Sequence, residues 1–146
     1  MGIRMDIIVL AFNFALLMCA FYAIVIGGRT GKAGSAIFIL ATILSNAAAW
    51  MDPDWVGTSF GLLAVDSFCL LALAVLALTS NRHWPLWAMG FQTVAVATHL
   101  ATLTAPEIVP KSYQALLSFW AIPILWVMVA GTHKDRQYKK RKTRPA

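Results

Sequence analysis

The residues of this chain best suited to chemistry are polar side chains set within long apolar stretches. Asp66 and His99 can each gain or lose a proton, and Asn13 and Asn46 add amide hydrogen bonds. A paired carboxylate and imidazole can hold or pass on a proton, and ionisable residues inside apolar segments often mark such a pathway. We predict that these four side chains meet in one intramembrane polar cluster.

Three further polar residues form a secondary seam beside this cluster: Thr42, Gln92 and Thr102. Residues three, four or seven apart share one face of a helix, so Gln92 and Thr102 extend the face that carries His99. Faces of small and polar residues are those through which membrane helices associate.

Three interpretations of the cluster are open. In the first, the polar groups bond to one another and only hold the helices together. In the second, Asp66 and His99 form a proton-linked pair or a small polar cavity, as in a small transporter or channel. In the third, His99 is an axial ligand of a haem or pigment, which would require a second ligand from a partner or a five-coordinate metal. We expect no cofactor and no metal site.

The composition determines which elements can position these residues. The chain has 146 residues, of which 60% are hydrophobic and only 12% charged, and its mean hydropathy is +0.71. Soluble domains carry about 25% charged residues, so too few polar side chains remain here to cover a surface facing water. This excludes an ordinary soluble enzyme, a disordered tail and a nucleic-acid-binding domain with a polar shell. The sequence therefore predicts an all-α integral membrane protein.

Five apolar stretches are each near the roughly 20 residues that a transmembrane helix requires. They cover about residues 7–26, 35–50, 56–79, 85–104 and 113–131. They would form a single transmembrane domain of residues 1–132, followed by a basic cytoplasmic tail of residues 133–146. Since the fifth stretch has no polar seam, we predict a four-helix core with a peripheral fifth helix.

The distribution of positive charge predicts the orientation. With the C-terminus in the cytoplasm, ten of the twelve Lys and Arg residues lie inside, including Arg29, Lys32 and Arg82, while Arg4 and Lys111 lie outside. This fits the positive-inside rule and predicts an N-out, C-in topology. Tryptophans at the ends of the stretches fit an aromatic belt: Trp50, Trp55, Trp84 and Trp87.

Depths along the predicted helices explain why the polar residues should meet. At about 1.5 Å per residue, Asp66 lies ~15 Å, Asn13 ~10 Å, His99 ~9 Å and Asn46 ~6 Å below the outer boundary. All four therefore belong to the outer half of the bilayer.

Positive charge is concentrated after the fifth stretch. Seven cations occur there: Lys134, Arg136, Lys139, Lys140, Arg141, Lys142 and Arg144. They can act as a topogenic signal that contacts anionic headgroups, or they can dock on a cytoplasmic partner. Nucleic-acid contact is not expected, because only Tyr138 accompanies this charge as a stacking aromatic.

No catalytic motif occurs at a recognised spacing, so we expect no enzymatic activity. The leading hypothesis is an accessory or scaffold subunit of a larger complex in a bacterial-type plasma (inner) membrane. It would bind another membrane protein, or a second copy, through small-residue helix faces, the fifth helix and the basic tail. The alternatives are a small proton-linked transporter or channel using Asp66 and His99, and a haem- or pigment-binding subunit.

Overall fold

Helices account for nearly all of the described chain. The computed structural model describes the backbone of residues 2–51, 60–104 and 110–142, and the side chains of residues 10–50, 60–102, 121–139 and 141. These residues form α-helices and no strand: α1 (Gly2–Ile26), α2 (Gly28–Met51), α3 (Phe60–Thr79), α4 (Trp84–Thr104) and α5 (Pro110–Lys142). The predicted all-α class is confirmed.

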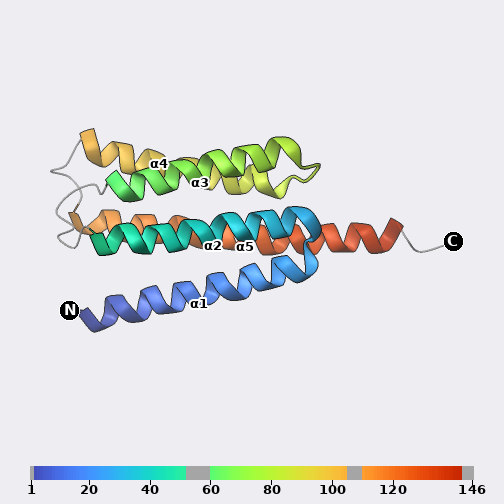
Figure 1. The fold of residues 1–146 in the computed structure, drawn as a ribbon, viewed down its shortest axis with the longest axis horizontal. Coiled ribbons are helices and arrows are strands. Elements are labelled where there is room, and N and C mark those ends of the chain that lie inside the picture. The colour runs from blue at the N-terminus through green and yellow to red at the C-terminus, as the bar shows by residue number, and fades with distance from the viewer. Residues whose placement is uncertain (1, 52–59, 105–109, 143–146) are drawn as a thin grey trace.

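The five helices lie side by side along one long axis, with the two chain ends at opposite ends of the bundle (Figure 1). Each helix packs against the next in sequence, and α5 packs against both α4 and α1, which closes the ring. The α1–α2 turn, the α3–α4 turn and the C-terminal part of α5 share one end of the bundle (Figure 1). We call it the basic end, after its described cations: Arg29, Lys32, Arg82, Lys134, Arg136, Lys139 and Arg141.

A pair of glycines reverses the chain between α1 and α2. Gly27 N–H donates to the Ala23 carbonyl at 2.8 Å, and Gly31 N–H donates to the Gly27 carbonyl at 3.1 Å, so helical bonding reaches the turn from both sides. Gly28 has a φ of 60°, a left-handed conformation that costs other residues roughly 1–2 kcal/mol. Glycine at this position is therefore what permits a connection of a single residue.

Trp84 joins three helices near the basic end. Its side chain is only 4% exposed. It lies against Gly34 of α2 and Gly131 of α5, and a Cβ atom added to either glycine would collide with the indole ring. The prediction that Trp84 belongs to an aromatic belt is therefore wrong, whereas Trp50 and Trp87 are exposed and Trp55 lies outside the described residues.

The structure also corrects the prediction of a peripheral fifth helix. Ile124, Leu125, Met128 and Thr132 of α5 are buried, and Met128 is fully enclosed. An apolar face that packs on other helices has the same composition as one that faces lipid, so the lack of a polar seam did not indicate a peripheral position. The helix also continues without interruption into the predicted basic tail, as far as Lys142, and we call residues 133–142 the basic segment of α5.

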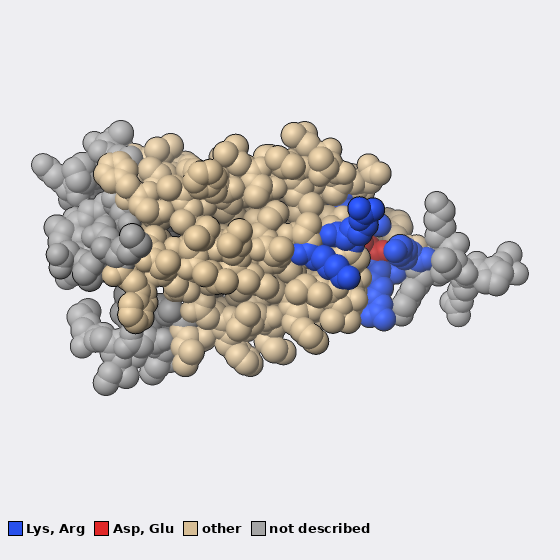
Figure 2. Space-filling model, in the orientation of Figure 1, with Lys and Arg blue, Asp and Glu red and all other residues tan. Residues whose placement is uncertain are grey.

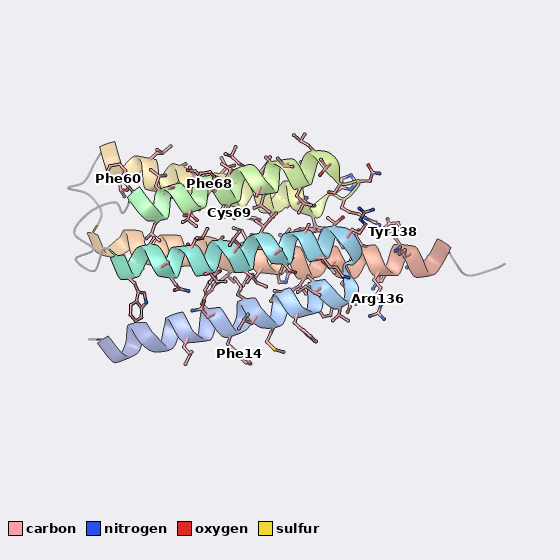
Figure 3. All side chains as sticks on the ribbon, viewed as in Figure 1. Phe14, Phe60, Phe68, Cys69, Arg136 and Tyr138 are labelled. Carbon is pink, nitrogen blue, oxygen red and sulfur yellow. The ribbon has the colours of Figure 1, made fainter. Side chains whose placement is uncertain are left out.

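Large apolar side chains cover much of the exterior of the bundle. Figure 3 shows Phe14 pointing away from the other helices, and Phe68 is likewise 70% exposed. Within the described residues, Gly28–Trp50 and Phe60–Thr79 are long and apolar enough to cross a membrane, and Leu10–Ile26 is a shorter apolar helix. These properties favour association with a membrane.

Candidate functional site

The contact between α3 and α4 holds the most polar group of buried side chains. Ala88, Gln92, Ala95 and His99 follow one another at helical spacing and are all buried, so they form the inner face of α4. Asp66 lies opposite, in the second turn of α3. Small alanines beside Gln92 and His99 let the two helices approach closely enough for these side chains to bond across the contact.

Asp66 accepts hydrogen bonds at both oxygens of its carboxylate. His99 Nε2 lies 2.9 Å from Asp66 Oδ2, and Gln92 Nε2 donates to Asp66 Oδ1 at 3.0 Å and to the Asp66 carbonyl at 3.3 Å. His99 is 2% exposed and the Asp66 side chain 26%. The Asp66 carboxylate and the His99 imidazole therefore share one hydrogen bond, and the hydrogen bond from Gln92 orients the carboxylate for it.

The other predicted polar residues lie apart from this contact. Thr42 donates to the Phe38 carbonyl at 2.8 Å, and Thr102 donates to the His99 carbonyl at 2.7 Å, so both hydroxyls bond within their own helices. Asn13 is half-buried on α1, and Asn46 is exposed on α2. Of the seven predicted polar residues, the structure brings together Asp66, Gln92 and His99.

A second polar group, which sequence reasoning missed, connects α1 to α5 near the basic end. Tyr22 Oη lies 2.7 Å from His133 Nδ1, and the two rings are stacked with centroids 6.5 Å apart. Gln137 Nε2 lies 2.9 Å from His133 Nε2. The positions of the two residues in the sequence could have indicated this contact. Tyr22 precedes the Gly27–Gly28 turn by one helical turn and His133 follows the fifth apolar stretch, so both are expected at the same end of the bundle.

An ion pair fastens the α3–α4 turn to α5 at the same end. Arg82 Nη1 lies 3.1 Å from Asp135 Oδ1. Burial raises the pKa of Asp135 above its ordinary value, and the neighbouring Arg82 opposes this shift without cancelling it. This contact places the α3–α4 turn beside the C-terminal part of α5.

The described cations of the basic segment are Lys134, Arg136, Lys139 and Arg141, and all four are exposed. Figure 2 shows Lys and Arg side chains gathered at the basic end, and Figure 3 shows Arg136 and Tyr138 on the part of α5 that extends beyond the other helices. The side chains of Lys140 and Lys142, and the whole of Arg144, lie outside the described residues.

No family model matches the chain. No curated protein and no solved structure matches it significantly either. Within the described residues, no three or more His, Cys, Asp or Glu side chains are grouped so that they could hold a metal ion.

Proposed function

We propose that the chain is a multi-pass protein of a bacterial-type plasma membrane, and that it serves as a non-catalytic accessory or scaffold subunit of a larger membrane complex. The observation that carries this proposal is the exposed apolar surface, to which every helix contributes. Examples are Phe21, Leu40, Phe68, Leu100 and Trp126. A bundle surrounded by water would require polar side chains at such positions, whereas lipid or another membrane protein accommodates apolar ones.

The proposed topology has five spans, with the N-terminus outside and the C-terminus in the cytoplasm. It is supported by the position of the described Lys and Arg side chains, all of which belong to the basic end (Figure 2). Since cytoplasmic segments carry the excess of positive charge, the basic end is assigned to the cytoplasm.

The role as a subunit is supported by the outer face of α4. Gly90, Thr93, Ala97 and Ala101 follow one another at helical spacing and are exposed. The Thr93 hydroxyl already donates to the Met89 carbonyl at 2.9 Å, so this face requires no further polar contact. A row of small residues lets a neighbouring helix approach closely and gain packing contacts.

Purification in mild detergent, combined with crosslinking, tests this role. We expect the wild type to retain a membrane partner, and Ala97→Trp to lose it because the indole would block the small-residue face. Leu71→Trp, on the exposed side of α3, is the matched control and should retain the partner. A wild-type chain that remains a lone monomer in crosslinked membranes would contradict the proposal.

A second candidate function, a small proton-linked transporter, is favoured by the contact between Asp66 and His99. In proteoliposomes, Asp66→Asn and His99→Gln would abolish a pH-dependent flux while the protein stays folded. Variants that only lower thermal stability would indicate a structural role. A haem or pigment site is not favoured, because His99 Nε2 is engaged by Asp66 and the ring is almost fully enclosed.

A further inference from the structure

An open groove between α1 and α5 lies near the basic end, next to the contact between Tyr22 and His133. Its volume is about 390 Å³. Trp126, Val129 and Ala130 line its apolar part, and Tyr22, His133 and Lys134 belong to its polar part. Along α5, the lining thus changes from apolar to cationic over about two helical turns.

The polar part of this α1–α5 groove presents a hydroxyl donor as well as a cation. An amide nitrogen can only donate, so in the contact with Gln137 Nε2 the His133 Nε2 accepts and the ring N–H is on Nδ1. Nδ1–H then donates to the Tyr22 oxygen. The Tyr22 hydroxyl hydrogen is thereby directed to a further acceptor, and Lys134 supplies positive charge beside it.

Charge complementarity identifies the class of ligand. The lining of the groove reaches the end of the bundle where the described cations are gathered (Figure 2). Trp126 is 71% exposed, so its indole offers an apolar surface outside the bundle core. A ligand that matches both parts has an anionic head that accepts hydrogen bonds and a long apolar tail, as anionic phospholipids do.

We propose that the α1–α5 groove binds an anionic phospholipid from the surrounding bilayer. Its phosphate lies against Lys134 and the Tyr22 hydroxyl, and an acyl chain lies along Trp126 and Val129. His133 and Gln137 position the Tyr22 hydroxyl. This inference rests on the proposed membrane placement, since the headgroup can reach Lys134 from the bilayer only if the basic end borders the lipid phase.

Competition between lipids tests the groove. The intact protein in detergent micelles is mixed with equal amounts of phosphatidylglycerol and phosphatidylcholine, and the bound lipid is counted by native mass spectrometry. We expect the wild type to prefer phosphatidylglycerol. Lys134→Gln should reduce this preference about tenfold, because the phosphate loses a direct hydrogen bond from a charged donor. Tyr22→Phe should also reduce it, while thermal unfolding verifies that both variants are folded.

Arg136→Gln is the matched control, because it removes one exposed cation from the same helix but lies outside the groove lining. It should leave the preference within twofold of the wild type. An equal loss in Arg136→Gln and Lys134→Gln would show general attraction to a polybasic helix and overturn the site. Displacement of phosphatidylglycerol by an equal concentration of inorganic phosphate would also overturn it, because the ligand would then be a soluble anion.

Alkaline carbonate extraction of cell membranes separates this proposal from the proposed function. Release of the chain into the soluble fraction would contradict the membrane placement itself. A chain that stays in the membrane but binds both lipids equally would overturn the groove and leave the membrane placement intact.

Discussion

Asp66 accepts the polar contacts that join α3 to α4 among the described residues. It accepts from both Gln92 and His99, and both of these donors are buried. Removing an acceptor from buried donors costs more than the hydrogen bonds contribute, because the donors have already lost their water. The pair is therefore both a candidate proton site and a structural constraint, and stability measurements can weigh the second role.

We expect Asp66→Leu to lower the free energy of unfolding by about 1–3 kcal/mol, because it leaves the Gln92 and His99 donors without their acceptor. Asp66→Asn should cost less, since its amide oxygen still accepts one hydrogen bond. Asn46→Leu, at an exposed site, is the control and should change stability by ~0.5 kcal/mol or less. Thermal unfolding in detergent measures all three, and equal melting temperatures for Asp66→Leu and Asn46→Leu would refute this expectation.

The ion pair between Arg82 and Asp135 should respond asymmetrically to substitution. Arg82→Gln leaves the partly buried Asp135 carboxylate without its ion-pair partner. Asp135→Asn instead removes the negative charge, whose burial is unfavourable and raises the pKa of Asp135. We therefore expect Arg82→Gln to destabilise the fold more than Asp135→Asn does. Each substitution should lower the free energy of unfolding by about 1 kcal/mol or less, because the ion pair is partly exposed. Chemical denaturation of the two variants at pH 7 compares them directly, and a larger loss in Asp135→Asn would contradict the expectation.

The same carboxylate predicts a pH dependence of stability. Its native pKa is raised, so the native chain binds this proton more tightly than the unfolded chain. The resulting contribution to stability is fully present below the ordinary pKa of 3.8 and is lost as the pH rises through the raised native value. The difference in unfolding free energy between wild type and Asp135→Asn should follow this course between pH 3 and pH 7. If the difference in unfolding free energy between the two proteins does not change with pH, the raised pKa of Asp135 is refuted.

At the scale of helices, sequence reasoning succeeded where composition alone decides the result and failed where packing decides it. The apolar stretches predicted helices, although α2 begins at Gly28 rather than near residue 35 and α5 continues to Lys142. The contact of Asp66 with His99 agrees with helical spacing and depth, whereas Asn13 and Asn46, which the same argument assigned to this cluster, lie apart from it on α1 and α2. The burial of Trp84 could not be foreseen, because it depends on Gly34 and Gly131 reaching the same indole from different helices.

The packing around Trp84 gives a prediction with a matched control. Gly131→Ala should destabilise the bundle by about 1–3 kcal/mol, since the new methyl group collides with the indole and α4 and α5 have to separate. Gly90→Ala makes the same change on the exposed face of α4, where nothing lies within 4 Å. It should stabilise the helix by ~0.5–1 kcal/mol. Circular dichroism during heating distinguishes them, and a neutral Gly131→Ala would show that the indole can move.

At the scale of the whole molecule, the two ends of the bundle should differ in accessibility across a membrane. Single cysteines replace Trp50, Arg29 and Arg136 in a chain whose Cys19 and Cys69 are changed to alanine. In intact spheroplasts, a membrane-impermeant maleimide should label position 50 only. Positions 29 and 136 should be labelled after the membrane is opened, because they belong to the basic end. Labelling of all three positions in intact spheroplasts would contradict the proposed topology.

The one-residue connection at Gly27 has a consequence for how the chain would insert into a membrane. A single residue joins α1 to α2, which leaves the two helices no room to move apart. In the proposed topology we therefore expect them to enter the bilayer together as a helical hairpin, with the Gly27–Gly28 turn remaining on the cytoplasmic side. If that topology holds, a nascent chain arrested before residue 51 has emerged should fail to insert α1, so that insertion of the first helix would depend on the second.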